Sequence, residues 1–344
     1  MNDAAEKSPA ASTSILTVSD LCTVFPTEEG LVTTVDAVSF SLKAGETLAV
    51  VGESGSGKTM TFLSVLRLVP PPGRVMGGEV WFDGTNIAAL PEQQMREIRG
   101  AGIAMVFQDP LTALNPVFTI GDQMIEVFRA HTTMNRRQAR ARAIEVLERV
   151  HIPSPAQRID DYPHQLSGGM RQRVLIAMAI ALRPKVLIAD EPTTALDVTV
   201  QAQILELLAE LRSELGMGMV LITHDLGLVA KYADRVAVMY AGRVVETSPI
   251  AQGFGQSRHP YTRSLFRSIP RLDVPADQAL TAIEGQPPNL AKLPEGCAFE
   301  PRCFLGNGRE DCRRERPLLA PTDTGLHLSA CPHWPSLPES EADA

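Results

Sequence analysis

The chain has 344 residues, 44% of them hydrophobic, and a formal net charge of −8. This length allows one large α/β domain or two moderate ones, and the apolar share is sufficient for a core, which excludes a disordered chain. The acidic balance argues against a broad electrostatic hold on nucleic acid, and no apolar run approaches the ~20 residues that span a bilayer.

The N-terminal segment, residues 1–14, lacks the basic start and apolar core of a signal peptide. We therefore expect a flexible tail and a chain that stays in the cytosol, where it can still dock on membrane partners. Residues 15–51 alternate apolar and polar positions around turn signals at 27–30 and 43–46. This pattern predicts two or three strands, the last of which ends in the apolar run 48–51.

A glycine-rich loop follows that last strand and precedes an apolar helical segment. Residues 52–59 read Gly-Glu-Ser-Gly-Ser-Gly-Lys-Thr, a complete phosphate-binding loop in the strand-to-helix context that it needs. Its glycines let backbone N–H groups face phosphate, Lys58 suits the β and γ phosphates, and the Thr59 hydroxyl suits Mg²⁺. The sequence therefore predicts a nucleoside triphosphate site. The expected nucleotide contacts are Gly52, Glu53, Ser54, Gly55, Ser56, Gly57, Lys58, Thr59 and Met60.

Beyond the loop, strand and helix patterns follow one another along the chain. Residues 78–84 predict a hairpin, and the periodicity is helical from 111 to about 180. Within that helical part, the basic run 136–142 is interpreted as a solvated helix face rather than a nucleic-acid contact. Further strands are predicted at 186–189, 219–223, 236–240 and 242–246.

Two adjacent carboxylates, Asp190 and Glu191, follow the apolar strand 186–189. A buried strand end would not tolerate both without a cation or a water to use them. Asp190 suits the Mg²⁺ shell, and Glu191 suits a base that faces the attacking water. A Gly-rich turn at 166–173 opens another helix, which by itself predicts an anion-binding helix N-terminus.

Together these motifs resemble the ATP-binding cassette (ABC) ATPases. The family's signature sequence is matched at Leu166-Ser167-Gly168-Gly169-Met170, Gln108 resembles the Q-loop glutamine, Ala195-Leu196-Asp197 resembles the D-loop, and His224 resembles the switch histidine. The resemblance covers residues 15–253. It implies an α/β P-loop NTPase fold with a mixed sheet core, an antiparallel β subdomain and a helical subdomain at about 111–180.

The family resemblance also implies a mechanism. Two such domains close head to tail around ATP, so Ser167 and Gly169 would contact the partner's ATP, and hydrolysis would undo the closure. His224 would contact the γ phosphate, and Gln108 would link Mg²⁺ and the water to the helical subdomain. Adenine would stack on Phe25, whose alternative interpretation is an apolar strand residue in the core. The implied catalytic residues are Glu191, His224, Gln108 and Lys58, the implied Mg²⁺ ligands are Thr59, Gln108 and Asp190, and Asp197 joins the nucleotide contacts.

The C-terminal part of the chain indicates which subgroup of the family it resembles. Residues 254–338 are expected to form an extension, with an acidic tail at 339–344. The segments 258–265 and 296–303 resemble the extension of ATPases that serve oligopeptide, dipeptide and nickel importers, and residues 107–116 are typical of the same group.

This resemblance implies a peripheral protein at the cytoplasmic face of the inner membrane. Its partners would be two permease subunits, a second and paralogous ATPase, and an extracytoplasmic solute-binding protein. The alternative function is a soluble ABC ATPase that acts on nucleic acid or ribosomes, but such relatives commonly carry two cassettes or long insertions. A non-hydrolysing regulatory cassette is disfavoured because Glu191 and His224 are both present.

Four cysteines lie in the extension, at Cys297, Cys303, Cys312 and Cys331, and Cys22 is interpreted as a core thiol. A cytosolic protein seldom uses disulfides, so four thiols in one short segment indicate a metal. The spacing has no C-x2–4-C knuckle, which disfavours structural zinc, and iron–sulfur clusters accept looser spacing. Some relatives of this extension hold a 4Fe-4S cluster, so we favour that cluster, with zinc or no metal as alternatives.

Overall fold

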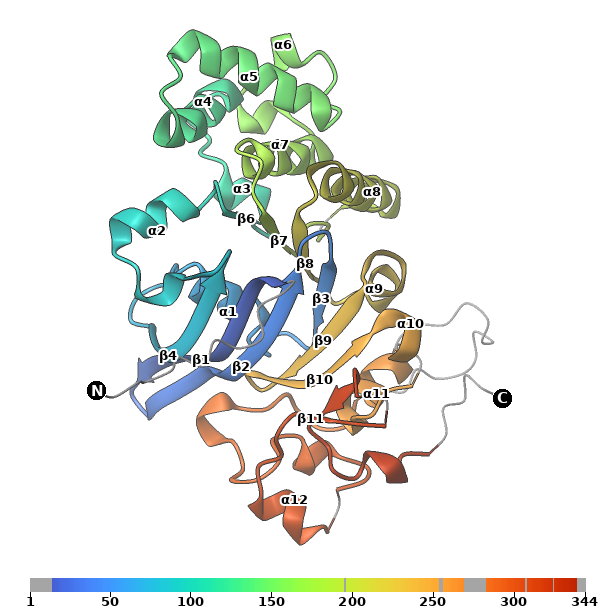
Figure 1. Cartoon of the computed structure of the whole chain (residues 1–344). Helices are drawn as coiled ribbons and strands as arrows, with labels where there is room; N and C mark the ends of the chain where they lie inside the picture. Colours follow the sequence, from blue (N-terminus) through green and yellow to red (C-terminus); the bar gives the residue numbers. More distant parts are fainter. Residues whose placement is uncertain are drawn as a thin grey trace, which may run out of the picture.

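The computed structural model describes residues 14–338, apart from 195, 254–255, 269–282, 307 and 324. Figure 1 shows a central sheet with helices above it and the C-terminal extension at the opposite end. The strands are β1 (Ser14–Thr27), β2 (Gly30–Lys43), β3 (Thr47–Val51), β4 (Arg74–Phe82), β5 (Thr85–Asn86), β6 (Ile103–Val106), β7 (Val186–Asp190), β8 (Gly218–Ile222), β9 (Arg235–Tyr240), β10 (Arg243–Pro249), β11 (Ala320–Pro321) and β12 (Leu328–Ser329). The α-helices are α1 (Lys58–Val65), α2 (Glu92–Ile98), α3 (Pro110–Ala113), α4 (Ile120–His131), α5 (Arg136–Arg149), α6 (Pro155–Arg158), α7 (Gly168–Ile180), α8 (Val198–Leu215), α9 (Leu226–Tyr232), α10 (Ile250–Gly253), α11 (Pro260–Arg267) and α12 (Glu310–Arg314).

The larger sheet has the strand order β11-β12-β10-β9-β3-β8-β7-β6 in the described part of the chain. Strands β9, β3, β8, β7 and β6 run parallel to one another. Strands β3, β7 and β8 are buried along their whole length, because their near-continuous apolar runs are covered on both faces. Their carboxyl ends share one edge of the sheet, and the polar residues of the candidate site follow directly from that edge.

The smaller sheet is antiparallel, with the order β2-β1-β4-β5 within the described residues. It confirms the strands predicted over residues 15–51 and the hairpin predicted at 78–84. Its inward face packs on α1, where Phe62 is fully buried and lies 5.5 Å from the ring of Phe40. This core joins the two sheets around the helix that carries the phosphate loop.

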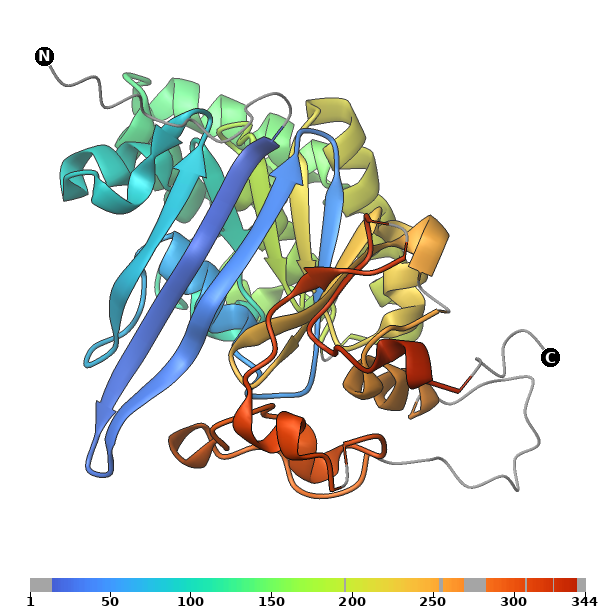
Figure 2. The ribbon, with the colours of Figure 1, turned by 60° about the horizontal axis from the view of Figure 1, so that its bottom comes forward.

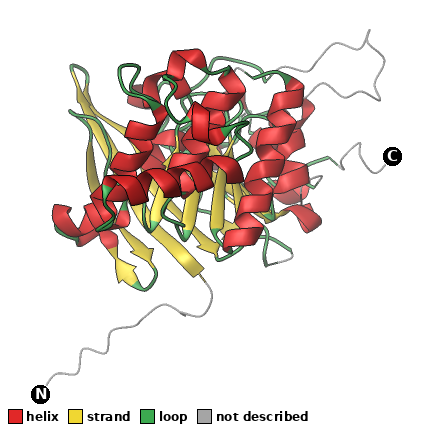
Figure 3. Cartoon of the chain, turned by 90° about the horizontal axis from the view of Figure 1, so that it is seen from above, coloured by secondary structure: helices red, strands yellow, loops and turns green. Residues whose placement is uncertain are grey.

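The helices expected between residues 111 and 180 are present as α3 to α7. Figure 3 shows the helices gathered over the strands when the molecule is seen from above. Residues of the basic run on α5 form ion pairs. Arg136 lies 2.5 Å from Asp122, and Arg140 lies 2.7 Å from Asp160. This run is therefore a solvated helix face, as the sequence predicted. Among the described residues, none of the helices is both long and apolar enough to cross a bilayer.

The extension shares the sheet and the core of the rest of the chain. Strand β12 pairs with β10, with Glu246 opposite Ser329, and β11 adds to its other edge. The ring of Tyr240 on β9 lies 4.5 Å from that of Tyr261 and 5.2 Å from that of Phe299. Figure 2 shows the extension crossing in front of this end of the sheet. The boundary expected at residue 254 thus marks a change in composition and not a gap in packing.

Candidate functional site

The phosphate loop joins β3 to α1, and two of its glycines are required by the backbone. Gly52 has φ +151°, and a Cβ on it would lie 2.2 Å from the carbonyl oxygen of Met239. Gly57 has φ +98°, and its Cβ would lie 2.6 Å from the carbonyl oxygen of Thr34. An L-side chain would be strained at both positions and would collide with backbone. These glycines allow the loop to wrap tightly against β9 and β2.

The loop offers cationic and donor groups that suit a phosphate chain. Helix α1 begins at Lys58 without a capping side chain, so its first N–H groups point free of the helix. The Ser56 hydroxyl is buried without a hydrogen-bond partner in the described structure. Burial lowers the pKa of Lys58, and the carboxylates of Glu191 and Asp190 oppose that shift. Its Nζ donates to the carbonyl oxygens of Gly52 at 2.9 Å and Glu53 at 3.0 Å.

The predicted Mg²⁺ ligands Thr59 and Asp190 lie together. The Thr59 hydroxyl donates to Asp190 Oδ1 at 3.1 Å, which links the start of α1 to the end of β7. Asp190 is 2% exposed, and this burial raises its pKa to about 6 despite the hydrogen bond. A hydroxyl and a buried carboxylate side by side are oxygen ligands of the kind that Mg²⁺ uses beside a phosphate. The residues present therefore fit a magnesium ion.

Two of the other predicted catalytic residues, Gln108 and His224, converge on Glu191. It has φ +43°, which turns the chain sharply after β7. Gln108 Nε2 donates to Glu191 Oε2 at 2.9 Å, and His224 Nδ1 lies 3.5 Å from the same oxygen. The Thr194 hydroxyl also donates to this oxygen at 3.0 Å. Sequence reasoning missed Thr194, and no local signal distinguishes it from the neighbouring Thr193.

The signature residues occupy a different place. Ser167 is the N-cap of α7, where its hydroxyl accepts from the N–H of Met170 at 3.3 Å. A Cβ on Gly169 would lie 2.7 Å from Val200 Cγ1, so this glycine allows α7 to approach α8. Asp197 caps α8 by accepting from the N–H of Val200 at 3.0 Å. No hydrogen bond joins Ser167 to the phosphate loop in the described part of the chain, and both caps are exposed.

Three further predicted contacts, Ser54, Gly55 and Met60, lie on the exposed or half-buried side of the loop and of α1. Phe25, the candidate adenine platform, is half-buried near the end of β1. A Cβ on Gly73 would lie 2.4 Å from Phe25 Cζ, so the ring packs against the segment between α1 and β4. Its stacking on adenine stays a prediction. Ala195, in the expected D-loop, lies outside the described residues.

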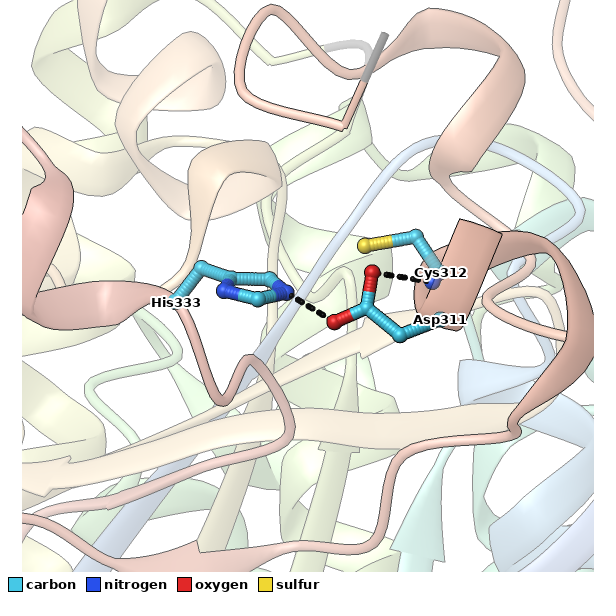
Figure 4. A group of neighbouring side chains, drawn as sticks. All are labelled: Asp311, Cys312 and His333. Atoms are coloured by element: carbon cyan, nitrogen blue, oxygen red, sulfur yellow. Dashed lines mark hydrogen bonds and ion pairs between the residues drawn. The ribbon is translucent and has the colours of Figure 1, made fainter. Parts of the chain in front are cut away.

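The four cysteines of the extension are free thiols that line one cavity of about 510 Å³. Burial raises the pKa of each, to about 11 for Cys312 and about 12 for Cys331. Asp311, Cys312 and His333 are the described metal-ligand group whose donor atoms all lie within 4.8 Å of one another. Figure 4 shows His333 Nε2 facing Asp311, at 2.7 Å from Oδ2. The four thiols therefore line one space, but among the described residues only Cys312 belongs to a group of metal-ligand atoms within 4.8 Å of one another.

Comparison with known proteins adds two family matches. The ABC transporter family model matches residues 35–194, and the model of the oligopeptide/dipeptide transporter C-terminal region matches residues 245–312. A Brucella abortus protein that is provisionally named a peptide import ATP-binding protein is 52% identical over 95% of this chain and 96% of its own length. The oligopeptide transport ATP-binding protein OppD of Bacillus subtilis is 48% identical over 96% of this chain and 92% of its own length.

Solved structures agree with these matches. The ATP-binding cassette MJ0796, in a dimeric post-hydrolysis state bound to ADP and phosphate, matches with a TM-score of 0.61 and 28% identity over 68% of this chain and 98% of that one. CbiO1 of Clostridium perfringens, part of the transporter complex CbiONQ, matches with a TM-score of 0.59 and 30% identity over 71% and 92%.

Proposed function

The chain belongs to the ATP-binding cassette transporter family, and on this premise we propose that it is the ATP-hydrolysing motor subunit of an importer for di- and oligopeptides or a related solute. The observation that carries the proposal is the convergence of Gln108, Thr194 and His224 on Glu191, beside the Thr59–Asp190 pair. The match of the C-terminal region to the oligopeptide/dipeptide transporter family supports the peptide class.

ATP is the substrate, and the residues of this chain divide the work of its hydrolysis. Lys58 and the start of α1 would hold the β and γ phosphates. Thr59, Asp190 and Gln108 would hold Mg²⁺, which would neutralise phosphate charge. Glu191 accepts a proton from a water whose oxygen bonds to the γ phosphorus. The bond from that phosphorus to the bridging oxygen breaks and leaves ADP. His224 contacts the γ phosphate.

A second ATPase completes the site. No hydrogen bond joins Ser167 or Gly169 to the phosphate loop among the described residues, and the exposed start of α7 suits a γ phosphate that arrives from a partner subunit. ATP then bridges two subunits and hydrolysis removes the bridge, which couples the reaction to opening and closing. We propose a paralogous ATPase as that partner.

The permeases have an exposed apolar surface on which to dock. Phe107, Leu111, Val117 and Phe118 lie around Gln108 and the starts of α3 and α4, and each is at least 41% exposed. Large apolar residues gathered on a surface mark an interaction site. A permease seated there would place the protein at the cytoplasmic face of the inner membrane, opposite an extracytoplasmic solute-binding protein.

Co-purification tests this function directly. Affinity-tagged protein, solubilised in mild detergent from membranes, should bring down two permease subunits and a second ATPase. Phe118→Ser combined with Val117→Ser should lose the permeases but keep ATP binding, and Lys58→Ala should keep the permeases but lose ATP binding. Fractionation with ribosomes or nucleic acid instead of membranes would support the alternative, a soluble ABC ATPase.

For the thiol cavity we propose a 4Fe-4S cluster held by Cys297, Cys303, Cys312 and Cys331. Support comes from the four thiols that line one cavity, since four cysteine ligands are the set that such a cluster takes. Zinc is the second candidate, favoured by one observation. Asp311, Cys312 and His333 present three close donors, a set of the kind that zinc binds.

A further inference from the structure

One residue of the extension reaches the phosphate loop. Arg302 forms a bidentate ion pair with Glu53, with Nη1 2.7 Å from Oε2 and Nη2 2.9 Å from Oε1. The side chain of Arg302 is only 6% exposed, and that of Glu53 is 22% exposed. Two parallel charge-assisted hydrogen bonds in a largely dry setting fix both the distance and the orientation of the two groups. The contact joins residues 249 positions apart in the chain.

The guanidinium is itself held in place. Its Nε donates to the carbonyl oxygen of Glu284 at 2.9 Å, and its carbon lies 5.9 Å from the ring centroids of both Tyr240 and Phe299. Arg302 ends the short 3-10 helix Glu300–Arg302, whose turn is closed by its own N–H donating to the Phe299 carbonyl at 3.0 Å. An arginine with so little freedom loses little entropy when it binds a carboxylate. It therefore acts as a rigid support and not as a mobile surface side chain.

A second residue of the C-terminal part holds the backbone of the same loop position. The N–H of Glu53 donates to the Tyr261 hydroxyl at 2.8 Å, and Tyr261 is fully buried on α11. Glu53 is thus held at its carboxylate by Arg302, at its N–H by Tyr261 and at its carbonyl by Lys58. The first two contacts come from beyond the cassette's last strand, and the third comes from the residue that binds phosphate.

We infer that Arg302 and Tyr261 are positioning residues for the phosphate loop, which set its shape before nucleotide arrives. The inference rests on the proposed function only in assuming that ATP binds this loop. A loop whose N–H groups are already aimed binds phosphate without first losing conformational entropy. Without the two contacts, residues 52–57 gain conformational entropy in the absence of nucleotide. The loss of that entropy then accompanies ATP binding and makes the binding free energy less favourable.

The test measures the Kd for Mg-ATP of full-length protein by equilibrium titration, together with KM and kcat for hydrolysis. Arg302→Gln should raise the Kd and KM for ATP about five- to tenfold, because ordering of the loop now accompanies binding, and should change kcat by less than about twofold. Tyr261→Phe, which removes one hydroxyl and keeps the ring, should raise the Kd about threefold. The matched control is Arg314→Gln, since Arg314 lies in the same extension and pairs with Glu310 on the surface.

A double-mutant cycle separates positioning from general stability. Glu53→Gln should weaken ATP binding about as much as Arg302→Gln, and the double variant should be no weaker than either one, because both remove the same contact. Arg302→Lys, which keeps the charge and loses the bidentate geometry, should fall between wild type and Arg302→Gln.

The inference is overturned if Arg302→Gln and Tyr261→Phe bind ATP with the same Kd as the control Arg314→Gln. A lower unfolding temperature of the two variants without nucleotide would then indicate a role in stability alone. Additive losses in the cycle overturn it as well. If Arg302→Gln does not fold, Tyr261→Phe alone decides between a raised and an unchanged Kd. Wild-type protein that fails to bind Mg-ATP would refute the proposed function instead, so the two failures are distinguishable.

Discussion

Glu191 owes its suitability as a base to the way in which its two carboxylate oxygens differ. Gln108 and Thr194 both donate to Oε2, so this oxygen is fixed by the protein. No hydrogen bond to Oε1 forms among the described residues, which leaves that oxygen to accept a proton from water. The positive φ of Glu191 is a strained conformation for a side chain of this size, and strain of this kind is concentrated at functional sites.

The first prediction concerns this carboxylate. Glu191→Gln should lower kcat for ATP hydrolysis by about 10²- to 10⁴-fold, because an amide cannot accept the proton, while the Kd for ATP stays within about twofold of wild type. The measurement is steady-state hydrolysis beside an equilibrium titration. Size-exclusion chromatography with ATP and the partner ATPase should also show the variant accumulating in a closed dimer. Hydrolysis at the wild-type rate would exclude Glu191 as the base.

The second prediction follows from the burial of Asp190, which raises its pKa to about 6, above the value near 3.9 of an unfolded chain. Between these values the folded state binds the extra proton, so this group destabilises the fold above pH 6 and ceases to do so as the pH falls toward 4. Asp190→Asn should therefore raise the free energy of unfolding at pH 7.5 by about 3 kcal/mol, and the gain should fall to about 1 kcal/mol at pH 4.5 and disappear as the pH falls below the unfolded pKa.

Denaturant unfolding of both proteins without nucleotide, at several pH values, checks this prediction. Asn can still accept the hydrogen bond from Thr59, so the comparison isolates the charge. The same variant should lose Mg²⁺-dependent hydrolysis. Asp190 would then lower the stability of the nucleotide-free protein and be required for the reaction with Mg²⁺. A gain that is equal at every pH would contradict the argument.

At the scale of the element, the start of α7 serves two needs with one side chain. The Ser167 hydroxyl caps its own helix, and the same exposed turn is the surface proposed to meet the partner's γ phosphate. Replacing Ser167 with a residue that cannot cap would cost about 1 kcal/mol of helix stability. A loss of activity could then come either from the weakened helix or from the lost contact with phosphate. A useful variant must keep the cap and change only the charge.

The third prediction uses that distinction. Ser167→Asp keeps an N-cap but places a negative charge at the turn, so it should block ATP-driven dimer formation and reduce hydrolysis at least tenfold by repulsion of phosphate. Ser167→Asn, the neutral cap, is the matched control and should retain most activity. The Kd of isolated monomers for ATP should change in neither. A large loss of monomer affinity in Ser167→Asp would place the turn at its own chain's nucleotide.

The elements that the sequence predicts well are those with a local cause. The continuous apolar run of β3 and the glycines at 52 and 57 are each decided by neighbours in the chain. Thr194 and Arg302 could not be predicted, because their importance comes from partners brought close by the fold. The pairing of β12 with β10 was also missed, because a strand of two residues is too short to show an alternating pattern in the sequence.

At the scale of the whole molecule, the extension is tied to the cassette by polar contacts as well as by packing. His327 Nε2 lies 2.5 Å from Glu246 Oε1, with both side chains 2% exposed, and the N–H of Arg258 donates to the same oxygen at 2.6 Å. Glu246 Oε2 is buried without a hydrogen bond among the described residues, so loss of the contacts to Oε1 would leave the whole buried carboxylate without a partner. The segment that carries the four cysteines, residues 297–331, is thus attached to β10 through His327 and to the phosphate loop through Arg302.

The last prediction concerns what fills the thiol cavity. Anaerobically purified protein should be brown, contain iron and sulfide, and lose its visible absorbance in air, because four thiols around one cavity provide the ligand set of a 4Fe-4S cluster. Cys331→Ser should remove the iron. Cys331 is the better choice than Cys303, which follows Arg302 directly and would disturb the phosphate loop by another route. Asp311→Asn and His333→Gln should keep the iron if the thiols are the ligands.

Metal analysis of these variants distinguishes the alternatives. Stoichiometric zinc that is lost in Asp311→Asn and kept in Cys331→Ser would place a single ion at Asp311, Cys312 and His333 and refute the cluster. Metal-free anaerobic protein would refute both sites. Because a bound metal would cross-link cysteines that lie far apart in the sequence, removing it should raise protease cleavage between residues 297 and 331. If Arg302 positions the phosphate loop, that loosening should also weaken ATP binding, whereas Cys22→Ser, which changes a thiol outside the extension, should alter neither cleavage nor affinity.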